Sequence, residues 1–192
     1  MQILRAAFAV FALAVFPLAS PAITWKVIGP GGGGAQFNPT ISPHDPKTVL
    51  VRCDMTGAYI THDAGNSWRM FNLRGVVSLF AFDPVDPNTI YAYSAGLFRS
   101  TDQGRTWALV YPAPASVERI LMPDDHAGER MITRDGRIPR MTALAIHPSD
   151  SKLLYAATAE GRGAPRPCNS QRTAAPHGPS WLTCPPQRVA ST

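Results

Sequence analysis

The sequence contains few of the residue patterns that metal, cofactor and nucleotide sites require. Its 192 residues include only three cysteines, Cys53, Cys168 and Cys184, and Cys, His, Asp and Glu nowhere recur at metal-ligand spacing. The glycines at 31–34 are not followed by the Gly-Lys-Ser/Thr of a P-loop. We therefore expect no metal ion and no cofactor. Cys53 lies in a strand-like run and is expected to be a buried thiol, while a Cys168–Cys184 disulfide is compatible with an exported protein.

Excess positive charge is absent from most of the chain. The net charge is +5, but residues 161–192 carry four arginines and no acid, which leaves 14 basic and 13 acidic residues in 1–160 (18 − 4 and 13 − 0). No basic stripe with interleaved aromatic residues occurs there, as a nucleic-acid-binding protein would need. We therefore do not expect nucleic acid as a partner.

Extended apolar runs are also missing, apart from one near the start. Residues 6–18 are apolar, Arg5 precedes them, and small residues follow at Ser20 and Ala22. A run with these flanks is typical of a secretory signal peptide, and it is too short to span a bilayer comfortably. We predict that 1–22 are a signal peptide, that the mature protein is secreted or periplasmic, and that it does not stay inserted in a membrane after cleavage.

Two octets of the form [S/T]-x-D-x-G-x-[S/T]-W are the most informative feature present. They begin at residues 61 and 100, 39 positions apart, and each lies between strand-like runs. The aspartate can accept backbone N–H groups and close a turn, the glycine supplies a positive φ, and the tryptophan can anchor the following strand. We expect a structural rather than catalytic role for these residues, which are Asp63, Gly65, Trp68, Asp102, Gly104 and Trp107.

These octets resemble Asp-boxes, also called BNR repeats, and they form part of a longer repeat. A Pro/Asp turn followed by a β-rich strand recurs at 41–51, 82–92 and 146–156. A period near 40 residues is typical of propeller blades, so we predict an all-β fold. Residues 23–160 would form a partial β-propeller of about three antiparallel four-stranded blades, the third without its octet. A closed propeller typically needs 4–8 blades, which is more than this length holds.

Two segments depart from the repeat. Residues 112–140 form a long charged insertion, for which a solvated loop is expected, although long insertions are often functional. Residues 161–192 abandon strand periodicity and contain six of the 19 prolines. We interpret 161–192 either as a Pro/Arg-rich disordered tail or, preferentially, as the product of a shifted reading frame.

The segment at 52–59, RCDMTGAY, suggests a function. Together with Trp25 and the glycine run, it resembles the start of glycoside hydrolase family seventy-four, the tandem-propeller xyloglucanases, which carry R-T-D-x-G-G-A-Y before the first Asp-box. The resemblance covers about 25–111 and departs at Cys53 and Thr56. It implies that Asp54 is the catalytic base. We predict Gly33, Gly34, Trp25 and Tyr59, in or beside these segments, as substrate-binding residues.

The implied reaction is inverting hydrolysis of a polysaccharide such as xyloglucan, with one carboxylate activating water and a second protonating the leaving oxygen. The family's acid belongs to a second propeller downstream, so we expect this polypeptide to be inactive alone. Asp54 as a turn residue ahead of Gly57 remains the competing interpretation. Two other functions stay open: a non-catalytic, sortilin-like propeller that binds protein or glycan, and an export-associated assembly factor.

The frame-shift interpretation predicts a definite nucleotide sequence. When the gene is read in all three frames from codon 155 onward, another frame should restore a glycine, an Asp-box octet and further blade repeats. Confirmation of the present frame by resequencing would contradict this and favour a short, self-associating or vestigial binding domain.

Overall fold

The computed structural model describes residues 24–31, 34–55, 57–123, 128–159, 172–173 and 180–184. These residues form an all-β protein with no α-helix and a single 3-10 turn, η1 (Pro114–Ser116). No helix in this part of the chain has the length and apolar character needed to cross a membrane. The segment predicted to be a signal peptide lies outside the described residues.

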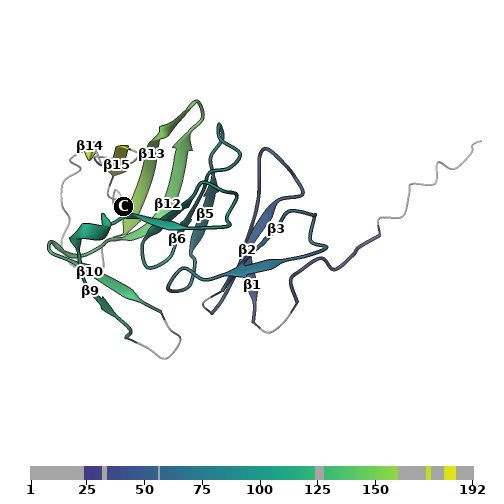
Figure 1. Ribbon diagram of the computed structural model, residues 1–192, viewed down its shortest axis with the longest axis horizontal. Helices are drawn as coiled ribbons and strands as arrows, with labels where there is room; N and C mark the ends of the chain where they lie inside the picture. The colour runs from purple at the N-terminus through teal and green to yellow at the C-terminus, as the bar shows by residue number, and fades with distance from the viewer. Residues whose placement is uncertain are drawn as a thin grey trace, which may run out of the picture.

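Three four-stranded sheets follow one another along the chain, and Figure 1 shows them side by side. The first two are antiparallel meanders, as predicted. The first sheet contains β1 (Gln36–Ile41), β2 (Val49–Cys53), β3 (Ala58–Thr61) and β4 (Arg69–Phe71). The second sheet contains β5 (Leu79–Phe82), β6 (Ile90–Tyr93), β7 (Leu97–Ser100) and β8 (Ala108–Tyr111). The third sheet contains β12 (Arg140–His147), β13 (Asp150–Ala159), β14 (Arg172–Thr173) and β15 (Ser180–Cys184).

The middle sheet is covered on both faces, and its sequence shows why. All four residues of β6 are buried. Alternate residues of a strand point to opposite faces, so Ile90 and Ala92 join a core with the first sheet, while Tyr91 and Tyr93 join a core with the third. A strand buried on both sides reads as a continuous apolar run. The two cores bind the three sheets into one stack.

The β5–β6 turn also links the sheets through polar contacts. Asp83 is fully buried, and its Oδ1 accepts hydrogen bonds from the backbone N–H of Val85 (2.8 Å) and of Asp86 (3.0 Å) and from Ser151 Oγ of the third sheet (2.9 Å). On the other side, His44 Nε2 of the first sheet contacts the Asp83 carbonyl oxygen at 2.7 Å. One turn of the middle sheet therefore contacts both neighbours.

The meander topology gives each of the first two sheets two distinct ends. The β1–β2 and β5–β6 turns lie at the same end as the octets, and we call this the octet end. The β2–β3 turn at 54–57 and the β6–β7 turn at 94–96 lie at the opposite end, together with the segments that lead into β1 and β5. We call this opposite end the β2–β3 end.

The two octets have the same internal hydrogen bonds. Asp63 Oδ1 accepts from Thr61 Oγ1 (2.7 Å) and from the Ser67 N–H (2.9 Å), and Oδ2 accepts from Ser67 Oγ (2.6 Å). The second octet repeats these three bonds with Asp102, Ser100 and Thr106 at 2.7, 2.8 and 2.6 Å. Each aspartate therefore holds the first and seventh residues of its octet together, which closes the turn.

The glycine and tryptophan of each octet occupy the positions that their chemistry suits. The positive φ predicted at the fifth position is confirmed, with 84° at Gly65 and 79° at Gly104. Trp107 stacks on Phe71 of the first sheet, with ring centroids 5.0 Å apart. Trp68 instead donates its Nε1–H to the Ile28 carbonyl oxygen at 2.7 Å. The second octet thus packs on the preceding sheet, and the first contacts the N-terminal segment.

Outside residues 124–127, which the structure does not describe, the segment at 112–140 is not the solvated loop that its charge suggested. It folds into a three-stranded antiparallel sheet, which Figure 1 shows extending to one side of the stack. Met131 is 2% exposed and belongs to the core between the first two sheets, and Val117 and Ile138 pack against it. These apolar residues attach the segment to the core, although its composition is largely polar. The strands are β9 (Val117–Leu121), β10 (Arg130–Thr133) and β11 (Gly136–Arg137).

The third sheet differs from the predicted antiparallel blade. Strands β12 and β13 pair antiparallel, but β15 pairs parallel with β13 and β14 lies at the edge. A parallel neighbour needs a crossover between the two strands, and most of the residues between β13 and β15 lie outside the described part, as does Cys168. Both β14 and β15 belong to the segment at 161–192, where the sequence showed no strand periodicity.

The octet carboxylates predict an acid-dependent loss of stability. Hydrogen bonds from Ser67 and Thr61 lower the pKa of Asp63 from 3.8 to about 2, and those from Thr106 and Ser100 lower the pKa of Asp102 to about 2. A lowered pKa in the folded state stabilises the protein above the unfolded value, and this stabilisation is lost as the pH falls. We expect the melting temperature to fall between about pH 4 and pH 2.

The matched variants isolate these two groups from the other carboxylates. The Asp63→Asn/Asp102→Asn double variant should melt at a lower temperature at pH 7 and show a flatter pH profile by circular dichroism. Asp135→Asn, in an exposed turn, should behave like the wild type. A double variant with the wild-type pH profile would contradict the prediction.

Candidate functional site

Asp54 follows the last residue of β2 directly and begins the turn to β3. The Cys53 N–H donates to the Gly57 carbonyl oxygen at 3.0 Å, which closes this turn. Asp54 therefore lies at the β2–β3 end, with the length of the sheet between it and the first octet. The side chain is exposed, so water and a ligand can reach the carboxylate.

The N-terminal segment docks on this turn through its backbone. The Asp54 N–H donates to the Ala35 carbonyl oxygen at 3.1 Å, and the Ala35 N–H donates to Asp54 Oδ1 at 3.2 Å. This reciprocal pair holds both the main chain and the carboxylate of Asp54 against the residue that precedes β1. Because the second contact ends on the side chain, the orientation of the carboxylate depends on the path of the N-terminal segment.

A thiol provides the second contact with the carboxylate. Cys53 Sγ lies 3.1 Å from Asp54 Oδ1 and donates a hydrogen bond to it. Cys53 is only 6% exposed, and the expectation of a buried thiol is confirmed. The Cys53 S–H is the largest influence on the pKa of Asp54 and lowers it; desolvation, the next largest, raises it, and the Ala35 N–H lowers it further, so that the net shift is downward. Asp54 is consequently ionised at neutral pH, as a general base must be.

Gly34 leaves the space that this arrangement needs. Its φ is 89°, and a Cβ at this position would lie 2.7 Å from Asp54 Oδ1 and 2.8 Å from Cys53 Sγ. Both values are far inside van der Waals contact, and the φ itself disfavours any other residue. The structure thus brings Gly34, one of the candidate substrate-binding residues, to Asp54. Gly33 lies outside the described residues.

The other two candidate substrate-binding residues are Tyr59 and Trp25, and they lie in different places relative to Asp54. Tyr59 lies on β3, opposite Val51 and Met70, on the face of the first sheet that points away from the second sheet. Trp25 is 90% exposed, and its neighbour Lys26 donates from Nζ to Asn66 Oδ1 of the first octet at 3.2 Å. Trp25 therefore lies toward the octet end, and the structure does not bring it to Asp54.

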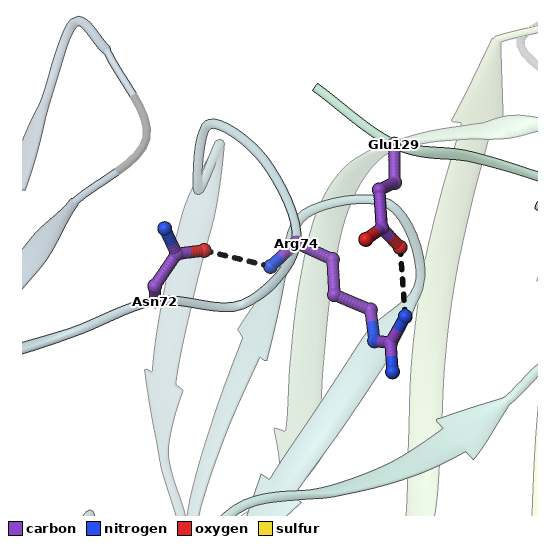
Figure 2. A network of polar contacts seen from close by, with 3 residues as sticks. All are labelled: Asn72, Arg74 and Glu129. Atoms are coloured by element: carbon purple, nitrogen blue, oxygen red, sulfur yellow. Dashed lines mark hydrogen bonds and ion pairs between the residues drawn. The ribbon is translucent and has the colours of Figure 1, made fainter. Parts of the chain in front are cut away.

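The insertion is attached at the same end as Asp54. Figure 2 shows Arg74, in the loop that leads to β5, contacting Glu129 next to β10. Arg74 Nη1 lies 2.8 Å from Glu129 Oε2, and the Arg74 carbonyl oxygen accepts from the Glu129 N–H at 2.8 Å. Arg74 has a positive φ of 64°, which the Asn72 side chain supports by accepting from its N–H at 2.9 Å. The β9–β11 sheet is thus anchored beside the loops of the β2–β3 end.

A separate pocket of about 120 Å³ lies at the octet end, between the first two sheets. Its polar lining includes Thr48 Oγ1, which contacts Asp45 Oδ2 at 3.0 Å and His62 Nδ1 at 3.2 Å. In the part of the chain that the structure describes, no three His, Cys, Asp or Glu side chains are grouped to hold a metal ion. The pocket and Asp54 are at opposite ends of the first sheet, so they are independent features.

Sequence reasoning missed the role of Cys53 in this geometry. It treated Cys53 as a departure from the family segment, and it did not connect the thiol to the carboxylate of the next residue. The available signal was the position of Cys53 at the end of an alternating strand, on the same face as buried Val51. A buried thiol followed directly by an exposed aspartate in a turn places sulfur and carboxylate within reach of each other.

Sequence comparison relates the chain to enzymes, and the relatives named here are all xyloglucanases. No protein-family model matches the chain. It is 32% identical over 186 residues to xyloglucanase Xgh74A of Acetivibrio thermocellus, a match that covers 82% of this chain and 20% of that protein. The xyloglucanase of Paenibacillus sp. is 30% identical over 162 residues (73% of this chain, 14% of the relative). That of Hypocrea jecorina is 30% identical over 174 residues (78% and 18%).

The chain therefore spans about a fifth of the length of these curated relatives, or less. The matches cover most of this chain, as expected for a segment that corresponds to part of a glycosidase.

Gly34→Ala tests whether the glycine is needed for its φ alone or for contact with Asp54. Both Gly34 and Gly31 have positive φ (89° and 71°), but a Cβ on Gly31 would meet nothing within 4 Å. We expect Gly31→Ala to destabilise the protein by about 1–2 kcal/mol, the cost of a left-handed backbone for alanine, and Gly34→Ala to destabilise it more, because its Cβ also clashes with Asp54 and Cys53. Only Gly34→Ala should shift the Asp54 carboxyl resonance. Urea denaturation and ¹³C NMR measure the two effects, and equal behaviour of the two variants would contradict the assignment.

Proposed function

We propose that this chain forms part of an exported glycoside hydrolase that acts on xyloglucan or a related β-glucan, with Asp54 as its general base. The observation that carries the proposal is the ionised, exposed carboxylate of Asp54, held by donors from Cys53 and Ala35. The similarity to xyloglucanases supports the choice of substrate.

We further propose that the sheets are blades of a β-propeller and that the octets are Asp-boxes. Three observations support this: the sheets follow one another in chain order, they pack face to face, and their first strands β1, β5 and β12 are neighbours. Among the described strands, none pairs the first sheet with the third, so the array is open. The remaining blades would come from other parts of an intact enzyme.

The proposed chemistry is inverting hydrolysis. Asp54, whose carboxyl group is ionised at neutral pH, would remove a proton from a water molecule as that water attacks the anomeric carbon. A second carboxylic acid would protonate the leaving oxygen from about 6.5–9.5 Å away. Glu129 lies at the same end of the sheets, but it forms an ion pair with Arg74, so we do not propose it as this acid. Since the matched region is about a fifth of the relatives' length, we propose that another part of the enzyme supplies the acid.

A non-catalytic binding module is the second candidate, and one observation favours it. Trp25 and Val27 are 90% and 94% exposed, next to the first octet and away from Asp54. Exposed aromatic and aliphatic side chains of this kind can bind a sugar ring or a protein surface. In this alternative Trp25 carries binding and Asp54 is a turn residue.

A chimaera distinguishes the two candidates. Residues 24–159 of this chain would replace the matching segment of the Acetivibrio thermocellus xyloglucanase, and hydrolysis of xyloglucan would be measured by reducing ends. We expect Asp54→Asn to lower kcat by about 10²–10⁴-fold, the usual contribution of a general base, with little change in KM. This chain by itself should release no reducing ends.

Asp135→Asn is the control, because it removes an exposed turn carboxylate to which no role is assigned. Its kcat should match that of the unsubstituted chimaera. An unchanged kcat in Asp54→Asn would refute the catalytic role. Loss of xyloglucan binding in Trp25→Ala, with Asp54→Asn unaffected, would establish the binding module instead.

A further inference from the structure

The hydrogen bonds that Cys53 and Ala35 donate to the Asp54 side chain are both accepted by the same oxygen. Oδ1 accepts from Cys53 Sγ at 3.1 Å and from the Ala35 N–H at 3.2 Å. Hydrogen bonds to an ionised carboxylate are stronger than those between neutral groups, so two of them restrain the side chain. One donor comes from the strand that precedes Asp54 and the other from the N-terminal segment.

The thiol cannot easily move away from this contact. Cys53 is 6% exposed at the end of β2, and its N–H is engaged with the Gly57 carbonyl oxygen. The space beside it is closed, because even a Cβ on Gly34 would lie 2.8 Å from Sγ. A thiol has a single hydrogen to donate, and the carboxylate oxygen is the acceptor within its reach. The packing therefore directs the S–H toward Asp54.

We propose that Cys53 is a positioning residue for Asp54: its thiol donates to Oδ1 and, together with the Ala35 N–H, holds the carboxylate in its orientation at the β2–β3 turn. This inference rests on the proposed function for its catalytic meaning, but the contact itself does not. Cys53 touches neither water nor substrate in this arrangement, and it acts only through the carboxylate. A side chain of similar size without a donor should fill the space and fail to hold Asp54.

The test compares Cys53→Ala and Cys53→Ser in the full chain by ¹³C NMR titration of the aspartate carboxyls. The Cys53 S–H is the largest cause of the lowered pKa of Asp54, so Cys53→Ala should shift that pKa upward. Cys53→Ser keeps a donor and should restore most of the wild-type value. Asp63 and Asp102, each with a pKa of about 2, serve as internal references for intact folding.

Three results would overturn the proposal. One is an Asp54 titration in Cys53→Ala that is the same as in the wild type. Another is an equal upward shift in both variants, with the references unchanged, because that would show that only the packing of sulfur matters. The third comes from the wild-type protein itself, through the Raman S–H stretching band.

The Raman measurement removes any dependence on the folding of Cys53→Ala. The S–H band that disappears in Cys53→Ser belongs to Cys53. It should move to lower wavenumber as Asp54 ionises, and it should stay constant over the same pH range in Asp54→Asn. A band that does not respond to the ionisation of Asp54 would mean that no hydrogen bond forms.

These outcomes separate the inference from the proposed function. If the Asp54 titration depends on the donor at residue 53 but Asp54→Asn leaves kcat unchanged in the chimaera, the positioning role stands and the catalytic role fails. If Asp54→Asn abolishes hydrolysis but substitution of Cys53 does not change the titration of Asp54, the catalytic role stands and the positioning role fails. If both hold, Cys53→Ala should lower kcat in the chimaera more than it changes KM, and Cys53→Ser should recover activity.

Discussion

The structure depends on burying both faces of the middle sheet. With Ile90 and Ala92 packed against one neighbour and Tyr91 and Tyr93 against the other, β6 leaves no face of its sheet for solvent. Burial of apolar area is the main favourable term in folding, and here it is available only when three sheets stack in order. Because the sheets stack face to face with their corresponding ends together, the turns of the octet end lie on one side of the molecule and the turns of the β2–β3 end lie on the other.

This alignment separates two kinds of aspartate. Asp63 and Asp102 lie at the octet end, and both oxygens of each accept bonds from hydroxyl or N–H groups of the same octet. Such a carboxylate is fully used in holding its turn. Asp54, at the other end, is held through Oδ1 by a thiol and one N–H. The Asp54 side chain is exposed at a turn and does not hold an octet together, which is why we place the proposed chemistry there.

The octets, the order of strands in the first two sheets and the buried thiol could be predicted from sequence, because turn chemistry and strand alternation are local. The insertion at 112–140 could not, since Met131 becomes a core residue only when the first two sheets are in place. The parallel pairing of β15 with β13 could not be predicted either, because the repeat indicates only antiparallel strands. The contact between Gly34 and Asp54 was not predicted from sequence, and Trp25, a candidate substrate-binding residue, lies toward the other end of the sheet.

The sequence by itself determined which residues make the turns and strands, because a Ser/Thr–Asp bond, a positive φ at glycine and an alternating apolar run act within a few residues. Only the tertiary structure decided what surrounds Asp54. Ala35 is 19 residues away along the chain, and Gly34 approaches the carboxylate through a path that no local rule specifies. Contacts of this kind depend on where two separate segments meet, and that is decided by the packing of the sheets.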